Sequence, residues 1–418
     1  MQCFEPGQII VLPREGGVDD LMRIFAEREA RTPFRVLYAI EDILRHYDVK
    51  PDDLFKQFGA LPFVAQVPEG EELEHAEMLR EMNSVQVAIP NFHVTPHRGD
   101  HHINTGAVED TIGELRCGSA SPSCGNGVKI AIIDTGIDPS LLRNPSTLYP
   151  QQYATDSPDP SRGSAPTDAA GHGTTVAYIV NAIAPAATIV SIKMMDHIGN
   201  IGGLVAAICL AEAQFKPDIY NLSLAVSCDS DICGSCGNTL NSAINADQLR
   251  YLFSLIDKRE DNSGDKPLLV AAAGNNRSQV LMPASFPNVL AVGSYDTKLS
   301  DFPSYSRYKQ VEPDRFILAP GGQQNRSTSM GYVPPDSYAR EDKFFFGTSF
   351  SAAFVTGIAA RYLCATKASP CSGMSGVRIP ADMQTRQFLM DSLAANSERT
   401  LRGYSPDRFG MGLAQYRL

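Results

Sequence analysis

The chain has 418 residues, which at roughly 100–200 residues per domain predicts two or three folded units. Hydrophobic residues make up 43% and charged residues 20%, as in globular proteins, so wholesale disorder is excluded. The net charge of −11 argues against nucleic acid and against an anionic membrane as the main partner. The first 98 residues hold 10 basic and 17 acidic side chains, which indicates a separate acidic module.

Neither the start of the chain nor its interior predicts export or membrane insertion. The first residues lack the basic and apolar regions of a secretion signal. The longest uncharged stretch, residues 169–192, contains polar side chains and a proline that a bilayer span would not tolerate. We expect a soluble protein that is cytoplasmic by default, although cysteine pairs leave secretion open.

The nine cysteines are compatible with more than one chemistry. Two pairs are seven residues apart and bracket turns that local disulfides would suit, Cys117 with Cys124 and Cys364 with Cys371. A third group lies in one loop: Cys228, Cys233 and Cys236. This loop lacks a clear fourth ligand, so it favours a disulfide or free thiols over a zinc site.

In chain order, the front of the sequence predicts a small α+β module. The expected elements are a strand at 8–12, a helix at 18–28, a strand at 63–67, a helix at 69–82 and a strand at 85–89 that Pro90 ends. An insertion at 32–60 carries its own amphipathic helix at 36–46. The module covers residues 1–98, and the polar segment 99–127 that follows predicts a linker or activation segment.

From residue 128 onward, short apolar runs alternate with helical stretches. Apolar runs at 128–133, 188–194, 218–224, 268–273 and 289–292 are typical of strands buried on both faces. Helices are expected at 172–183, 202–215, 240–257 and 348–364. This alternation predicts an α/β domain, residues 128–418, with a parallel sheet covered by helices on both faces. Ligands in such sheets bind beyond the carboxyl ends of the strands.

Three short motifs fall at such positions. Asp134 ends a buried strand in the sequence IIDTG, His172 lies between glycines at a helix start, and Ser349 lies at the start of an apolar helix. Each has an ordinary structural explanation: a turn aspartate, a buried histidine and a helix-capping serine. Together they supply an acid, a base and a nucleophile for acyl transfer. Asn275, after another apolar run, is a candidate donor to the oxyanion.

The four motifs, in the order Asp134, His172, Asn275 and Ser349, resemble those of the subtilisin-like serine proteases over residues 125 to 415. The resemblance implies a serine endopeptidase that works through an acyl-enzyme, with these four residues as its catalytic groups. It also implies a substrate-binding backbone at Ser223, Leu224, Ala225 and Gly274. No cofactor is needed for that chemistry; structural calcium is common in the family, and no calcium loop is identifiable here.

The front module resembles the inhibitory propeptide of the same family, although the insertion at 32–60 is not standard. The resemblance implies a zymogen in which the propeptide, as an intramolecular partner, is removed by self-cleavage beyond Phe92. The expected partners are polypeptide substrates and this propeptide, with neither nucleic acid nor membrane.

Two other functions remain open from the sequence. A DTG motif also occurs in aspartic proteases, which would require a homodimer because only one copy is present, and would leave the other motifs without a role. A subtilisin-like scaffold that binds peptides without cutting them is the second alternative. Four histidines at 93, 97, 101 and 102 suggest a metal site or a pH sensor for propeptide release, because imidazole titrates near neutral pH, although an ordinary polar linker is the favoured explanation.

Overall fold

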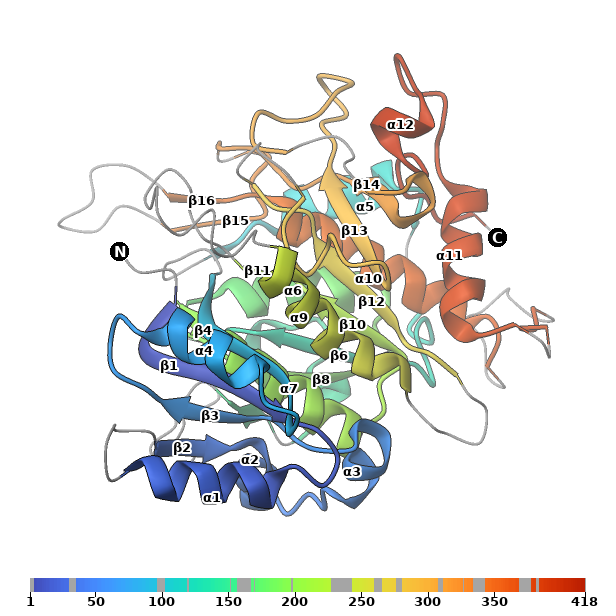
Figure 1. Ribbon diagram of the computed structural model, residues 1–418. Helices are drawn as coiled ribbons and strands as arrows, with labels where there is room; N and C mark the ends of the chain where they lie inside the picture. The colour runs from blue at the N-terminus through green and yellow to red at the C-terminus, as the bar shows by residue number, and fades with distance from the viewer. Residues whose placement is uncertain are drawn as a thin grey trace.

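Figure 1 shows the computed structural model of the chain, in which the front module, drawn in blue, lies against a larger α/β body. The structure describes residues 4–29, 35–95, 102–118, 120–150, 152–155, 167–168, 170–196, 198–226, 243–258, 265–275, 280–306, 311–325, 327–333, 343–367, 377–380 and 383–417.

The α/β body is built on a seven-stranded sheet in the order β14-β13-β12-β10-β6-β8-β7, and every neighbouring pair is parallel. Its strands are β6 (Lys129–Asp134), β7 (Tyr153–Ala154), β8 (Thr188–Lys193), β10 (Ile219–Leu222), β12 (Leu268–Ala272), β13 (Val289–Ser294) and β14 (Phe316–Ala319). Almost all of their residues are buried, which explains the near-continuous apolar runs in the sequence.

Helices cover both faces of this sheet. They are α6 (His172–Ile183), α7 (Ile201–Gln214), α9 (Ala243–Ser254), α10 (Thr348–Cys364), α11 (Thr385–Asn396) and α12 (Pro406–Phe409), with short 3-10 turns η1 (Pro139–Leu141), η2 (Pro145–Thr147), η3 (Leu255–Lys258) and η4 (Pro313–Arg315). The chain passes from β6 through α6 to β8, then returns through α7 to β10 on the other side of β6. Because such crossovers are right-handed, the two steps place α6 and α7 on opposite faces.

Helix α10 packs against α6 and against the middle of the sheet, so these two helices share a face. The predicted fold class, a parallel sheet with helices on both faces, is confirmed. The strand order reverses direction between β6 and β10, and their carboxyl ends form the switch point where sheets of this type bind ligands.

The front module is an antiparallel sheet with two helices on its outer face and two shorter helices that pack against the body. Its elements are β1 (Phe4–Pro13), α1 (Val18–Glu29), β2 (Arg35–Ala39), α2 (Ile40–His46), α3 (Asp52–Phe58), β3 (Phe63–Gln66), α4 (Glu72–Arg80) and β4 (Val85–Thr95). The sheet order β11-β4-β1-β3-β2 also includes β11 (Ala225–Val226) of the body, and β9 (Gly199–Asn200) pairs with β4. One sheet therefore joins the two parts of the molecule.

Both faces of the front sheet are apolar, but they pack against different neighbours. Side chains alternate along a strand, so adjacent residues of β1 point to opposite faces. Ile9 packs in a cluster with Leu21 of α1 and Leu79 of α4, within the module. Ile10 belongs to the main core of the molecule, which includes Leu204 of α7. One face of the front sheet therefore belongs to a core that the module shares with the body.

The helix predicted for residues 36–46 was wrong in its first half. Residues 35–39 form β2, which pairs with β3 with Tyr38 opposite Val64. Helix α2 begins only at Ile40, whose N–H donates to the carbonyl of Pro62 at 3.1 Å. The pairing with β3 prevails over the local helical pattern because it buries Tyr38 and completes the sheet.

The strand expected to end at Pro90 continues to Thr95. Proline cannot donate a backbone hydrogen bond, so it is tolerated where one side of a strand has no partner. Near Pro90 the pairing of β4 with β1 is irregular, and β4 pairs with β9 and β11 only from His93 onward. The strand therefore passes Pro90 and enters the body.

The segment 99–127, expected as a linker, contains regular structure. Strand β5 (His102–Ile103) pairs with β15 (Gly331–Val333), which in turn pairs with β16 (Lys343–Phe345). Helix α5 (Thr105–Glu114) follows, with the side chain of Asn104 accepting a hydrogen bond from the N–H of Ala107 at 3.2 Å. The buried Val108 and Ile112 attach it to the main core.

The local disulfide considered for Cys117 and Cys124 is not formed, and both side chains are buried thiols. Burial raises the pKa of Cys117 to about 12, so this thiol is inert near neutral pH. The Cys364 thiol is also buried, and it donates to the carbonyl of Ser123 at 3.6 Å. Cys371 and the loop with Cys228, Cys233 and Cys236 lie outside the described residues. None of the described helices is both long enough and apolar enough to cross a bilayer.

Candidate active site

Asp134 and His172 meet at the carboxyl end of the central sheet. Asp134 is the last residue of β6 and His172 is the first residue of α6. The ring Nδ1 of His172 lies 2.7 Å from Oδ1 of Asp134, and both side chains are about 1% exposed. The same carboxylate oxygen accepts the N–H of Thr135 at 2.8 Å. These two bonds fix the direction of the carboxylate and the orientation of the ring.

The glycines on either side of His172 make this approach geometrically feasible. Gly171 has a φ of +77°, in the left-handed region that glycine adopts without strain. A Cβ on Gly173 would lie 2.3 Å from the carbonyl oxygen of Gly136. Any larger residue there would push α6 away from the end of β6, so the glycines serve the close approach that the sequence predicted.

Asp168 is a positioning residue that the sequence analysis missed. Its carboxylate accepts the N–H groups of Gly171 at 2.6 Å and Thr174 at 2.8 Å, which caps the N-terminus of α6. It also accepts the hydroxyl of Thr135 at 2.8 Å. The carboxylate thus connects the loop after β6 to the helix that carries His172. An aspartate four residues before a helix-starting histidine was the available signal.

Opposing electrostatic effects act on His172. Burial by itself would lower the pKa of the imidazole, because it disfavours the charged form. The charge and hydrogen bond of Asp134, with the charge of Asp168 further away, outweigh burial, and the pKa is raised from its ordinary value of 6.5. The other ring nitrogen, Nε2, is buried and has no hydrogen-bond partner among the described residues. It is the atom left for a proton transfer.

Ser349 is the second residue of α10, where the helix leaves N–H groups without intrahelical acceptors. Its hydroxyl donates to the carbonyl of Ser223 at 3.0 Å, and the Ser223 hydroxyl donates back to the carbonyl of Ser349 at 2.8 Å. The ring of the next residue, Phe350, lies 5.4 Å from the ring of His172. The structure thus places the start of the helix that carries the nucleophile candidate near the imidazole, with the Ser349 hydroxyl turned toward Ser223.

Asn275 lies directly against the start of α10. Its side-chain oxygen accepts the N–H of Thr348 at 2.9 Å and the Thr348 hydroxyl at 3.1 Å. With the oxygen held by Thr348, the amide nitrogen is the donor end of the side chain. This nitrogen lies over Gly347, where a Cβ would approach it to 2.6 Å. A carboxamide donor therefore lies next to the N-terminus of the serine helix.

The predicted substrate-binding segment lies along one side of this site. Ser223 and Leu224 follow β10 and are buried, and Ala225 begins β11. Gly274 donates its N–H to the hydroxyl of Thr348 at 3.0 Å, which ties the end of β12 to α10. The structure therefore places all four predicted residues around the start of α10 or on the strand beside it.

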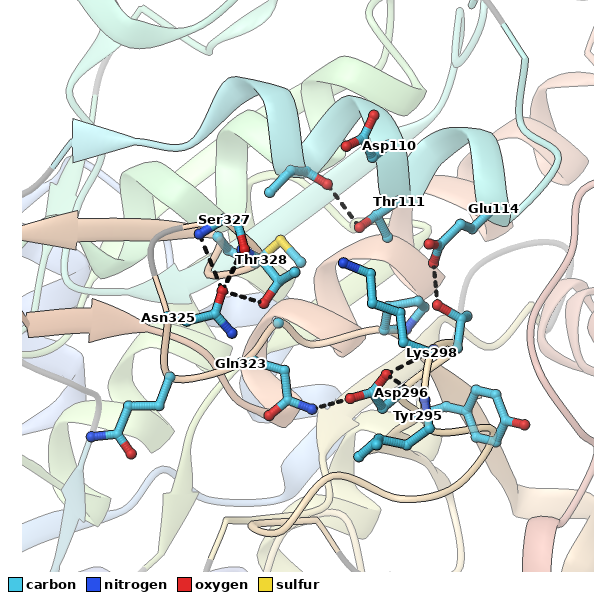
Figure 2. Close-up of a pocket in the computed structure, with 17 residues that line it drawn as sticks. Asp110, Thr111, Glu114, Tyr295, Asp296, Lys298, Gln323, Asn325, Ser327 and Thr328 are labelled. Atoms are coloured by element: carbon cyan, nitrogen blue, oxygen red, sulfur yellow. Dashed lines mark hydrogen bonds between the residues drawn. The ribbon is translucent and has the colours of Figure 1, made fainter.

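A separate cavity of about 790 Å³ lies between α5 and two loops of the body, residues 295–299 and 320–330. In Figure 2 its polar groups pair with one another: Thr297 donates to Glu114 at 3.0 Å, and Gln323 reaches Asp296. Asp134, His172, Asn275 and Ser349 are not among the residues that line it. Within the described part of the chain, no group of three or more His, Cys, Asp or Glu side chains is placed to hold a metal.

Comparison with known proteins places this geometry in a family. The profile of the subtilase family matches residues 125–412. The chain is 29% identical over 253 residues to a thermophilic serine proteinase from Bacillus sp. (strain AK1), covering 56% of this chain and 52% of that protein. It is 30% identical over 247 residues to a thermostable alkaline protease from Halalkalibacterium halodurans, covering 56% of each. The chain thus spans about half the length of these curated relatives.

Solved structures agree on the fold. Fervidolysin from Fervidobacterium pennivorans superposes with a TM-score of 0.60 at 16% identity, covering 99% of this chain and 60% of that one. The epidermin leader peptide processing serine protease from Staphylococcus aureus superposes with a TM-score of 0.63 at 16% identity, covering 99% and 97%. At this identity the likeness shows the fold alone. Because the family profile covers well over half of its residues, the chain belongs to the subtilase family.

Proposed function

We propose that this chain is a serine endopeptidase that cleaves peptide bonds through an acyl-enzyme. The observation that carries the proposal is the buried hydrogen bond of 2.7 Å between His172 and Asp134, near the helix α10 that has Ser349 as its second residue. Membership of the subtilase family supports the same reaction. The chemistry requires no cofactor, since the acid, base, nucleophile and oxyanion donors are all protein groups.

In the proposed reaction, Nε2 of His172 takes the hydroxyl proton of Ser349 while Oγ bonds to the substrate carbonyl carbon. Asp134 holds the ring in the required tautomer and stabilises the imidazolium. The amide of Asn275 and the backbone N–H of Ser349 donate to the oxyanion. The C–N bond then breaks, His172 gives its proton to the leaving amine, and water releases the acyl group by the same steps in reverse.

The hydroxyl of Ser349 has to turn for this step, because it donates to the carbonyl of Ser223. A substrate strand offers a reason for it to turn. Strand β4 pairs antiparallel with β11, with Thr95 opposite Ala225, and a position two residues further along such a strand comes opposite Ser223. An N–H of the bound peptide would then compete for the Ser223 carbonyl and free the hydroxyl for His172.

We further propose that the chain is a zymogen and that residues 1–98 are its inhibitory propeptide. Strand β4 lies between β9 and β11, with Val94 opposite both Gly199 and Val226, as an extended substrate would. After β4, the next strand is β5, which pairs with β15 of the body. Self-cleavage would fall within residues 96–101, at or next to the bond after His97 by the count above. Residues 128–418 would then be the catalytic domain.

An intact-mass time course of the full chain beside its Ser349→Ala variant tests both proposals. We expect the unsubstituted chain to lose about 97 N-terminal residues, while the variant stays whole and its peptide turnover falls about 10⁶-fold. A fluorophosphonate should label the unsubstituted chain only. Ser146→Ala, an exposed serine that bonds to Asn144, is the matched control and should behave as the unsubstituted chain does.

Two outcomes would contradict the proposals. Cleavage in Ser349→Ala at the normal rate would mean that another group or a contaminating protease cuts the chain. An unsubstituted chain that neither reacts with fluorophosphonate nor cuts any peptide would favour the peptide-binding scaffold instead.

A further inference from the structure

The nonstandard insertion of the front module, residues 32–60, contacts the body at a place separate from strands β9 and β11. It forms β2, α2 and α3, and both helices pack against α7, while α3 also reaches η3. The side-chain amide of Gln57 on α3 donates to the carbonyl of Leu255 in η3 at 3.2 Å. The insertion therefore adds an attachment to those made by β4, which pairs with β9 and β11 and also contacts α9.

The most specific contact of the insertion is made by Tyr47, which follows α2. Its hydroxyl donates to the carbonyl of Ala154 at 2.9 Å and accepts the N–H of the same residue at 2.8 Å. Ala154 lies on β7, the strand at one end of the central sheet. The next residue, Thr155, donates its N–H to Lys193 of β8, so the backbone groups of Ala154 face the open edge. The Tyr47 hydroxyl thus pairs with both outward-facing backbone groups of Ala154 at the edge of the sheet.

The body is shaped to receive the insertion. The Tyr47 ring packs edge-on against Tyr153, with ring centroids 4.9 Å apart. Gly202 lies at the start of α7, where a Cβ would come within 2.6 Å of the Tyr38 hydroxyl. The same glycine donates its N–H to the side chain of Asn91 on β4 at 2.9 Å. The start of α7 therefore contacts both the insertion and strand β4.

We propose that the insertion is an additional binding element, besides β4, that slows the departure of the cleaved front module from the catalytic domain. The inference rests on the proposed function, because it concerns the propeptide after self-cleavage. Linked contacts raise each other's effective concentration, and the module leaves only when all of them are open at the same time. The partner surface is β7, α7 and η3 of the same chain.

The test is the double variant Tyr47→Phe with Gln57→Ala in the full chain. Intact mass follows cutting, size-exclusion chromatography follows separation of the module, and peptide turnover follows activity. We expect cutting at the normal rate and release at least about tenfold faster, since three hydrogen bonds across the interface are lost. The matched control is Tyr404→Phe with Gln66→Ala, which removes the same groups outside these contacts.

A second arm makes the test independent of self-cleavage. In the Ser349→Ala background, a recognition sequence for an added site-specific protease replaces residues 96–101, and separation is measured after that protease cuts. Faster separation of the double variant than of its control supports the inference even if the chain never cuts itself, which would instead reject the zymogen proposal. Equal rates of separation in both arms would overturn the inference. If the double variant melts early, Gln57→Ala alone is used.

Discussion

The two sheets of this protein are buried in different ways. The central parallel sheet is covered on both faces by helices of its own domain, of which α10 and α6 share one face. The front sheet has its own helices, α1 and α4, on one face only, and its other face is covered by the body (Figure 1). The central sheet is therefore a self-contained scaffold, while the front sheet is complete only when it is docked.

The difference in burial suits the central sheet to hold a rigid active site and the front sheet to act as a removable module. A scaffold whose strands are fixed on both faces can hold Asp134, His172 and Ser349 in a fixed relation at its carboxyl edge. The front sheet packs one face against the body, so it is fully buried when it is docked and exposes that apolar face when it leaves. Substitutions at the active site should have the largest effects, and substitutions on the two faces of the front sheet the smallest.

Replacing the acid of the fixed site should have the largest effect. We expect Asp134→Asn to lower turnover about 10⁴-fold, because His172 loses the partner that sets its tautomer. Steady-state kinetics on a peptide measure this, and a melting curve checks that β6 and α6 stay in place. A loss of less than tenfold would show that Asp134 does not orient the base.

The same substitution predicts a pH effect with a definite sign. His172 acts as a base only when neutral, and its raised pKa keeps the proton on the ring to higher pH. The acid limb of kcat/KM should therefore lie above the ordinary imidazole value of about 6.5. In Asp134→Asn the largest raising influence is gone, so the limb of the residual activity should move to lower pH. A limb that stays in place or moves up would contradict this assignment.

The oxyanion donor should have a smaller effect. We expect Asn275→Ala to lower turnover about 10²–10³-fold with little change in KM, since the donor acts on charge that develops in the transition state. The hydrogen bonds that Asn275 makes to Thr348 complicate the alanine variant. Asn275→Asp keeps those acceptors and removes the donor, so it should lose turnover as well. Unchanged turnover in both variants would reject the role.

The two faces of β1 offer the smallest and most direct comparison. Ile9 and Ile10 are both 0% exposed, so replacing either by alanine should cost about 2–5 kcal/mol of stability. Hydrogen exchange on uncut Ser349→Ala should distinguish the faces. Ile10→Ala should speed exchange in β1 and in α7, whereas Ile9→Ala should affect β1, α1 and α4. Identical exchange patterns would mean that the front sheet is not divided between two neighbours.

The central sheet was predictable because its strands are uniformly buried. The runs at 128–133 and 188–194 match β6 and β8 to within a residue, and the helices at 172–183 and 348–364 match α6 and α10 at both ends. A strand that is apolar on both faces, followed by a helix with glycine at its start, leaves few local alternatives. The four catalytic candidates could be named for the same reason, since each falls at an end of such an element.

The front module and the linker were less predictable because distant partners decide their structure. Residues 36–39 have a helical pattern and become a strand by pairing with β3. Pro90 predicts the end of a strand locally, but pairing with β9 and β11 extends β4 beyond it. Asp168 shows the same limit in the site, because its value lies in groups from both β6 and α6.

The sequence by itself determined the class of fold, the family resemblance and the candidate groups for acyl transfer. These depend on periodicity and on residue types at element ends, which are local properties. Only the tertiary structure decided that the Ser349 hydroxyl rests on Ser223, that the front sheet borrows a face, and that Tyr47 binds the edge of β7. Each of these is a contact between groups far apart in the chain, and no local pattern encodes which distant surface a side chain will meet.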